Sequence, residues 1–126
     1  MSTSIEQEIQ AKGLTAPRIT PTDLEKNITS EFYFTAADGC AGASGHRPDG
    51  VRAGTALSLL TFCVLVLKNG FTVTGESACA SPENFDEQIG RKIARQNAVE
   101  KVWPLMGYEL RSKLAVRESA VSKLGS

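Results

Sequence analysis

The chain has 126 residues, of which 41% are hydrophobic and 22% are charged, values typical of one folded domain rather than of a disordered chain. Its 14 basic and 14 acidic side chains cancel, so no long-range field attracts it to nucleic acid or to an anionic membrane, and we expect neither as a partner. Three cysteines without a CxxC pair indicate free thiols in a reducing cytosol, and a single histidine argues against a structural zinc ion.

The first segments of the chain are predicted to be an arm and a helix. Residues 1–16 are polar and lack the pattern of a secretion signal. A short helix and an arm are both open for them, and we expect an arm that contacts another chain. A capping threonine, a proline and an acid in Thr20–Asp23 predict the start of a helix that ends between residues 35 and 39. The apolar residues of this helix share one face: Leu24, Ile28 and Phe32.

A glycine-rich loop is predicted next. Five glycines and one proline lie between residues 39 and 54, and such a density of breakers disfavours regular structure. A loop of this length in a small domain is either functional or disordered, and both interpretations stay open. Its first part, Gly39–Gly45, is superficially like a phosphate-binding loop but lacks the Gly-Lys-Ser/Thr ending, so a linker or lid is favoured.

The centre of the chain predicts a β-hairpin. Residues 57–67 are apolar on both faces, which is typical of a strand covered on both sides, and the apolar run is too short to span a membrane. Asn69-Gly70 favours a two-residue turn into a second strand. In that register one face, expected to meet helices of this chain, carries Phe62, Val64, Val66, Phe71 and Val73. The other face, expected to meet another element or another subunit, carries Leu65, Leu67, Thr72 and Thr74.

The last part of the chain predicts helices. Ser81–Glu83 has the pattern of a helix start, and apolar residues at helical spacing indicate a core face: Phe85, Ile89, Ile93, Val99 and Trp103. Pro104 is expected to break or kink this helix, with a further segment to residue 116 and a fraying tail at 117–126. The elements together predict a single α+β domain at residues 17–116, in which a small hairpin-centred antiparallel sheet packs against two or three helices and the chain forms a homo-oligomer.

The corner between the hairpin and the second long helix is the candidate ligand site. Small hydroxyl residues and a glycine precede a helix start, where unpaired amides and the helix dipole favour an anion. The candidate ligand-binding residues are Thr74, Gly75, Glu76 and Ser77 for phosphate or ribose, Asn84 and Phe85 for the pocket wall, and Arg91, Lys92 and Arg95 for phosphate charge. In the plainer alternative Ser81 merely caps the helix, Glu87 pairs with Arg91, and the arginines are solvated.

The sequence shows no catalytic set, so we expect no enzyme, no cofactor and no metal site. His46 lies in the glycine-rich loop without a visible partner, and a nucleophile needs a neighbouring base. Glu83 is explained by the helix start, which leaves Glu76 without a paired acid. Cys79 fits a packed thiol, because no base accompanies it.

Three blocks of sequence resemble a family of small tailed-phage and prophage proteins named after the gene forty-nine product of a coliphage and the gene sixty-six product of a Shigella phage. These blocks are LTFCVLVLKNGFTVTGES at residues 60–77, NFDEQIGRKIA at 84–94 and WPLMGY at 103–108. The resemblance covers roughly residues 17–114 and implies phage origin and action in the cytoplasm of the bacterial host. Members vary in the glycine-rich loop, so its residues inherit nothing.

Two functional hypotheses follow. By analogy with phage proteins that sequester nucleotide immune signals, the first is an anti-defence homo-oligomer. It binds a nucleotide-like ligand, of the cyclic ADP-ribose or cyclic dinucleotide type, without turnover. The alternative is a phage protein that binds and inhibits a host protein through the hairpin face or the glycine-rich loop. An enzyme that degrades such a signal ranks third.

Overall fold

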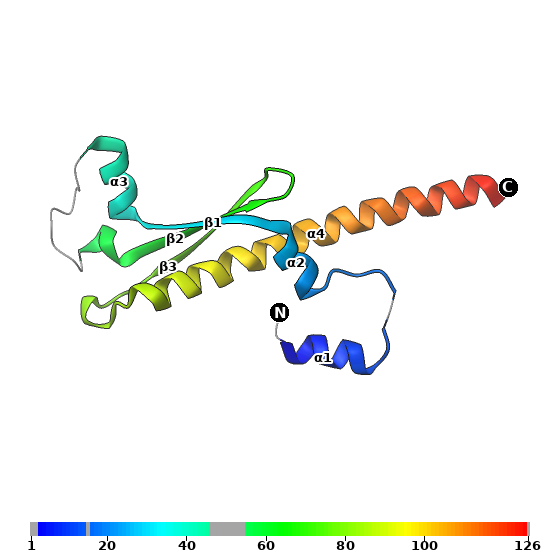
Figure 1. Ribbon diagram of the computed structural model, residues 1–126, viewed down its shortest axis with the longest axis horizontal. Helices are drawn as coiled ribbons and strands as arrows, with labels where there is room; N and C mark the ends of the chain where they lie inside the picture. The colour runs from blue at the N-terminus through cyan, green and yellow to red at the C-terminus, as the bar shows by residue number, and fades with distance from the viewer. Residues whose placement is uncertain (1–2, 15, 46–54, 126) are drawn as a thin grey trace. The chain divides into compact units, whose positions relative to one another are not determined.

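The computed structural model describes residues 3–14, 16–45 and 55–125 and has the predicted α+β class. Its helices and strands are α1 (Thr3–Ala11), α2 (Pro21–Asn27), β1 (Ile28–Thr35), α3 (Ala36–Ser44), β2 (Leu60–Leu67), β3 (Thr72–Ala78) and α4 (Glu87–Gly125) (Figure 1). Short 3₁₀ helices lie at Ala56–Leu59 and Pro82–Asn84. The chain divides into two compact units, one of residues 28–99 and one of residues 1–27 with 100–126.

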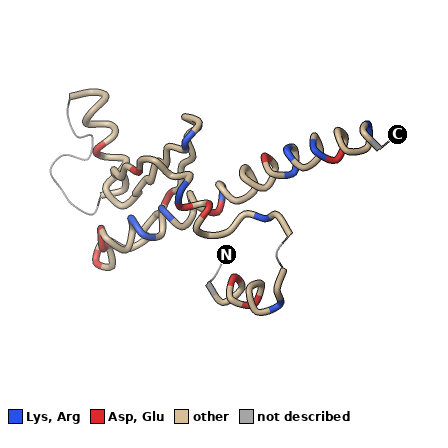
Figure 2. The backbone as a smooth tube through the Cα atoms, turned by 45° about the vertical axis from the view of Figure 1, so that its right-hand side comes forward, with Lys and Arg blue, Asp and Glu red and all other residues tan. Residues whose placement is uncertain are grey.

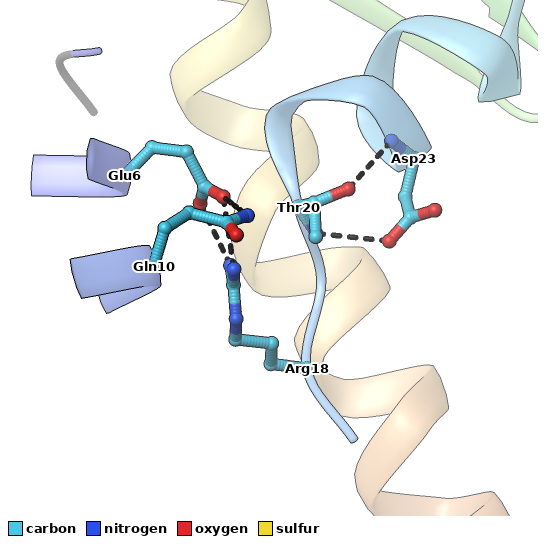
Figure 3. Close-up of polar contacts among 5 residues, drawn as sticks. All are labelled: Glu6, Gln10, Arg18, Thr20 and Asp23. Atoms are coloured by element: carbon cyan, nitrogen blue, oxygen red, sulfur yellow. Dashed lines mark hydrogen bonds and ion pairs between the residues drawn. The ribbon is translucent and has the colours of Figure 1, made fainter. Parts of the chain in front are cut away.

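The helix predicted from Thr20 begins where expected but ends early. Asp23 N donates to Thr20 Oγ1 at 3.1 Å and Thr20 N donates to Asp23 Oδ2 at 2.9 Å, which makes a capping box (Figure 3). The helix ends at Asn27, so the prediction that it runs on to residues 35–39 is wrong. Residues 28–35 form β1 instead, because their β-branched and aromatic side chains favour a strand that pairs along the length of β2.

The glycine-rich segment is a helix in its first part, so the predicted loop is wrong over residues 39–44. Thr35 and Asp38 form a capping box at the start of α3, and Gly45 closes its end in the left-handed conformation, with φ of 82°. The strong caps at both ends explain why a segment with two internal glycines is helical. The rest of the predicted loop, residues 46–54 with His46, lies outside the described residues.

The hairpin exists, but its loop has three residues, Lys68–Gly70, rather than two. Leu67 N donates to Phe71 O and Gly70 N donates to Leu67 O, each at 2.9 Å, and Gly70 takes the left-handed conformation with φ of 87°. This is a common three-residue hairpin closure. Val66 therefore pairs with Thr72 and Leu65 with Val73, one residue away from the predicted register.

This one-residue shift exchanges the two faces of β3 relative to β2. Because side chains alternate along a strand, Val73 joins Leu65 and Leu67, while Thr72 and Thr74 move to the other side. The prediction that helices of this chain meet the Phe62, Val64 and Val66 face holds only at one end, where α3 lies against Phe34, whereas α4 packs on the opposite face. The buried face carries Thr61, Cys63, Leu65, Leu67 and Val73, in a sheet with strand order β1-β2-β3.

The first part of α4 covers the buried face through small residues. A Cβ placed on Gly75 of β3 would lie 2.1 Å from the Ala94 carbonyl oxygen and 2.3 Å from the Ala98 nitrogen, so the helix backbone rests on the strand. One helical turn earlier, Gly90 packs on the Thr61 side chain of β2, where a built Cβ would lie 3.1 Å from the Thr61 hydroxyl oxygen. Gly90, Ala94 and Ala98 are all buried. The stripe of small residues permits a close approach of helix and sheet.

The core face predicted for this helix is therefore wrong. Two of the residues assigned to it, Ile89 and Ile93, are exposed. The other three are half-buried: Phe85, Val99 and Trp103. The large apolar residues flank the contact, and the small residues at the intervening positions make it.

The long helix also differs from prediction at both ends. It begins at Glu87 rather than at Ser81, since Pro82–Asn84 form a separate 3₁₀ turn. Pro104 lies inside α4 and does not end it, and the segment predicted to fray is helical to Gly125. Residues 105–124 contain many strong helix formers, namely leucine, alanine, lysine, arginine and glutamate, which explains the continuation.

The unit that contains the N-terminus is held in part by an ion pair. Arg18 donates to both carboxylate oxygens of Glu6, at 2.7 and 2.8 Å, and Gln10 donates to the same carboxylate at 2.7 Å (Figure 3). The pair ties α1 to the segment before α2. The predicted arm at residues 1–16 thus contains a helix, and its contact with another chain stays a prediction.

Candidate functional site

The four candidate residues at the hairpin exit lie within β3 rather than in a loop. Thr74 and Glu76 point to the face opposite α4, whereas Gly75 and Ser77 point to the α4 face. Gly75 is buried beneath the helix, and the amide of Asn97 donates to the Glu76 carbonyl oxygen at 2.7 Å. The structure therefore does not bring these four residues together around one ligand. Gly75 lacks a side chain, and this allows α4 to pack closely on β3.

A backbone amide at the start of α4 already donates a hydrogen bond to a carboxylate of this chain. Asp86 Oδ1 accepts from Ile89 N at 3.0 Å, and Glu83 and Glu87 lie beside it in the sequence. Ser81, the predicted cap, donates instead to Glu83 Oε2 at 2.7 Å. Three acids next to one helix terminus oppose the binding of a phosphate there. Asn84 and Phe85, the predicted pocket wall, end the 3₁₀ turn that precedes these acids.

The two candidate arginines lie together along β1, each with a carboxylate partner. Arg91 pairs with Glu87 at 2.6 Å and stacks over the Tyr33 ring at 5.6 Å from its centroid. Arg95 pairs with Glu31 at 3.0 Å. Lys92, the third candidate, is exposed one residue further round the helix. Figure 2 shows the acidic residues at the start of α4 and the basic residues that follow them. The Glu87–Arg91 pair of the plainer alternative is thus confirmed, whereas its Ser81 cap is absent.

Burial controls the titratable groups beneath this helix. Desolvation raises the pKa of Tyr33 to about 12, with Cys63 and Glu31 adding to the effect. Burial likewise raises the pKa of the Cys63 thiol. Both groups stay neutral at physiological pH, and a neutral buried thiol is a poor nucleophile.

The most prominent surface of the unit is the face of the sheet opposite α4, which we call the open face. Its centre carries apolar side chains from β1 and β2: Phe32, Phe34, Leu60, Phe62, Val64 and Val66. Phe32 is 56% exposed and Phe34 is 38% exposed. The rings of Phe34 and Phe62 stack across the strands with centroids 5.6 Å apart. Serine, threonine and one glutamate surround the centre: Ser30, Thr72, Thr74 and Glu76.

Only α3 reaches the open face among the described helices of residues 28–99, and it does so at one end. Gly39 of α3 lies against the Phe34 ring, at 3.4 Å for a Cβ built there. α4 runs along the opposite face, as Figure 1 shows. An apolar centre rich in aromatic rings and bordered by polar residues is the anatomy of a protein interface.

The sequence contains a pattern that indicates this face, although the same residues were predicted to be helical. In β1, Phe32 and Phe34 alternate with Glu31 and Tyr33 at the period of a strand. Reading the same residues at the period of a helix placed only Phe32 on an apolar stripe. The alternation would have identified both β1 and its outward aromatic residues.

The described residues also show how their metal-binding side chains and apolar helices are arranged. No group of three or more histidine, cysteine, aspartate or glutamate side chains in the described ranges is arranged to hold a metal ion. None of the helices in the same ranges has the length and apolar character needed to cross a membrane.

Comparison with known proteins identifies the family. Searches of curated proteins and of solved structures returned no match. A family model, the Phage protein (N4 Gp49/phage Sf6 gene 66) family, matches residues 19–114. This match includes the whole sheet, α3 and the first two thirds of α4, and it contains all three blocks that carried the resemblance. The chain therefore belongs to this family of phage proteins.

Proposed function

We propose that this phage protein acts in the cytoplasm of its bacterial host by binding and inhibiting a host protein through the open face, without catalysing a reaction. The observation that carries the proposal is the exposed aromatic centre of the sheet. Phe32 on the edge strand β1 is 56% exposed, so more than half of its apolar surface contributes nothing to the stability of the monomer, because an apolar side chain stabilises in proportion to the area removed from water. A partner that covers Phe32 removes the exposed part of this side chain from water.

The composition of the face favours a protein over a small anion. Among the described strand residues of this face, none is basic and the one acid is Glu76 at the border. Burying one aromatic side chain in a well-packed interface stabilises a complex by about 2 kcal/mol or more, which is the size of an interface hot spot. Phe32 is the side chain best placed for that role.

The nucleotide hypothesis receives less support from the geometry. Arg91 and Arg95 would have to exchange Glu87 and Glu31 for phosphate, and Gly75 is not accessible beneath the helix. An exposed ion pair is weak, so such an exchange is energetically small, but the acids would remain beside the ligand. Their charge would oppose a dinucleotide.

The test is quantitative affinity capture from infected cells with the wild type and two variants. Phe32→Glu places a charge in the apolar part of the open face, on the edge strand β1. Phe71→Glu is the matched control, because Phe71 is 55% exposed but lies at the hairpin end, on the α4 side of the sheet register. We expect a stoichiometric host protein with the wild type and with Phe71→Glu, and at least about a 10-fold loss with Phe32→Glu.

Three results would contradict the proposal. The first is equal capture by both variants, with circular dichroism confirming that both are folded. The second is a nucleotide released by heating the purified protein, with its loss in Arg91→Ala and Arg95→Ala; this outcome supports sequestration instead. The third is a self-association that Phe32→Glu abolishes, which would make the open face a contact between copies.

A further inference from the structure

The C-terminal part of α4 carries an apolar stripe whose last two residues are largely exposed. The stripe consists of Leu110, Leu114, Val121 and Leu124, at spacings of four, seven and three residues. Val121 is 68% exposed and Leu124 is 89% exposed, while Leu110 and Leu114 are half-buried. These are the spacings of the two inward positions of a coiled-coil heptad, with Arg117 at the one inward position that is not apolar.

A helix of this kind needs a partner to be stable. Most helical stability in proteins comes from packing an amphipathic face rather than from intrinsic helix propensity. The ion pairs along this segment, such as Lys113–Glu109, are exposed and contribute little. The stripe is therefore the feature through which this segment gains stability.

We propose that the partner is a second copy of this chain, and that two α4 segments pack antiparallel as a short coiled coil over residues 107–124. In this arrangement Leu110 of one chain lies opposite Val121 of the other, Gly107 opposite Leu124, and Leu114 opposite Arg117. Arg117 then lies beside a leucine and can extend its charged end to water. A parallel dimer in register would place the two Arg117 side chains against each other.

The charges beside the stripe are self-complementary in the antiparallel orientation. Arg111 and Glu118 lie on the same flank of the helix, since within one chain they form an ion pair of 2.7 Å across two turns. In the antiparallel dimer this flank meets the same flank of the second copy. Arg111 of each chain then faces Glu118 of the other, and the two-fold symmetry makes the contact twice.

The first test compares two valines of almost equal exposure on different sides of α4. Val121 is 68% exposed and belongs to the stripe, whereas Val116 is 69% exposed and lies five residues earlier, about 140° round the helix and outside the stripe. Sedimentation equilibrium of the full chain should show a reversible dimer. Val121→Asp should raise the dimer dissociation constant at least about 10-fold, and Val116→Asp should leave it within about 2-fold. A wild type that is monomeric at every concentration, or equal effects of the two variants, would overturn the proposal.

The second test uses charge reversal to separate the orientations. Arg111→Glu and Glu118→Arg should each weaken self-association, because both place like charges opposite each other across the dimer. Mixed together, the two variants should form a heterodimer tighter than either homodimer, because every pair across that interface is again of opposite charge. An Arg111→Glu chain that dimerises like the wild type would exclude the antiparallel arrangement. Neither variant alters the open face, so both tests are independent of the proposed host partner.

Discussion

Replacing Gly75 by alanine should destabilise the protein more than any other single-methyl change in the sheet. A Cβ at this position would lie 2.1 Å from the Ala94 carbonyl oxygen, 2.3 Å from the Ala98 nitrogen and 2.9 Å from the Ala98 Cα. Ordinary contact begins at 3.4 Å, so about 1.3 Å of separation is missing at the shortest contact. All three neighbours are backbone atoms, which cannot rotate away as a side chain would.

The helix must therefore move off the sheet to accept the methyl group. That movement loosens the contacts of Gly90, Ala94 and Ala98 together, because they lie on one rigid element. Inserting a methyl group into a packed core costs about 1–3 kcal/mol, and occasionally more. We expect a loss of about 3 kcal/mol for Gly75→Ala, since no side chain can absorb the strain. For a chain of this length such a loss lowers the melting temperature by roughly 10 °C.

Urea denaturation followed by circular dichroism measures the change. The control is Gly42→Ala in α3, where a Cβ meets nothing within 4 Å and alanine is the better helix former. We expect Gly42→Ala to raise stability by up to about 1 kcal/mol. A Gly75→Ala protein within about 0.5 kcal/mol of the wild type would refute the close packing of α4 on β3.

Three further outcomes are expected. Thr61→Val should stabilise the protein by about 1 kcal/mol in the same denaturation assay, because the buried Thr61 hydroxyl lacks a hydrogen-bond partner in the described structure. A loss of stability would show that this hydroxyl makes a hydrogen bond in the folded protein. With a thiol reagent the exposed Cys40 should react rapidly and the buried Cys63 only on unfolding, and equal rates would contradict the buried β2 face. The hydrogen bonds from Arg18, aided by Gln10, lower the pKa of Glu6 from 4.5 to about 2. The pair should therefore stabilise α1 above pH 4.5 and lose its effect as the pH falls towards 2. NMR titration of Glu6 should show a midpoint closer to 4.5 in Arg18→Gln, where the hydrogen bond from Gln10 remains.

The sequence predicted those elements whose signals are local. The hairpin, the start of α2 and the α+β class follow from turn residues, capping residues and alternation. The sequence also identified the family, because the blocks at residues 60–77 and 84–94 are specific. These predictions need no knowledge of which distant residues meet.

The errors arose where tertiary pairing overrides a local preference. Residues 28–35 carry both an apolar stripe at helical spacing and the alternation of a strand, and the pairing with β2 selects the strand. In α4 the large apolar residues Ile89 and Ile93 predicted the wrong core face, because the small residues beside them make the contact with the sheet. The spacing of Gly90, Ala94 and Ala98 at every fourth position was visible, but its meaning depends on Gly75 on the facing strand. Of the nine candidate ligand residues, the structure gives packing or ion-pair roles to Gly75, Arg91 and Arg95.

The length of the hairpin loop decides the character of the open face. With a two-residue loop, Val73 would lie beside Val66 on the open face, and the hydroxyls of Thr72 and Thr74 would be buried on the α4 side. The third residue of the loop reverses this, so that β3 sends Val73 and Gly75 towards the helix and threonines outward. The apolar part of the open face therefore comes from β1 and β2 alone, and the β3 border is polar. A partner that excludes water from this face must dock towards the β1 edge, which is why Phe32, rather than any residue of the hairpin tip, is the side chain on which binding should depend.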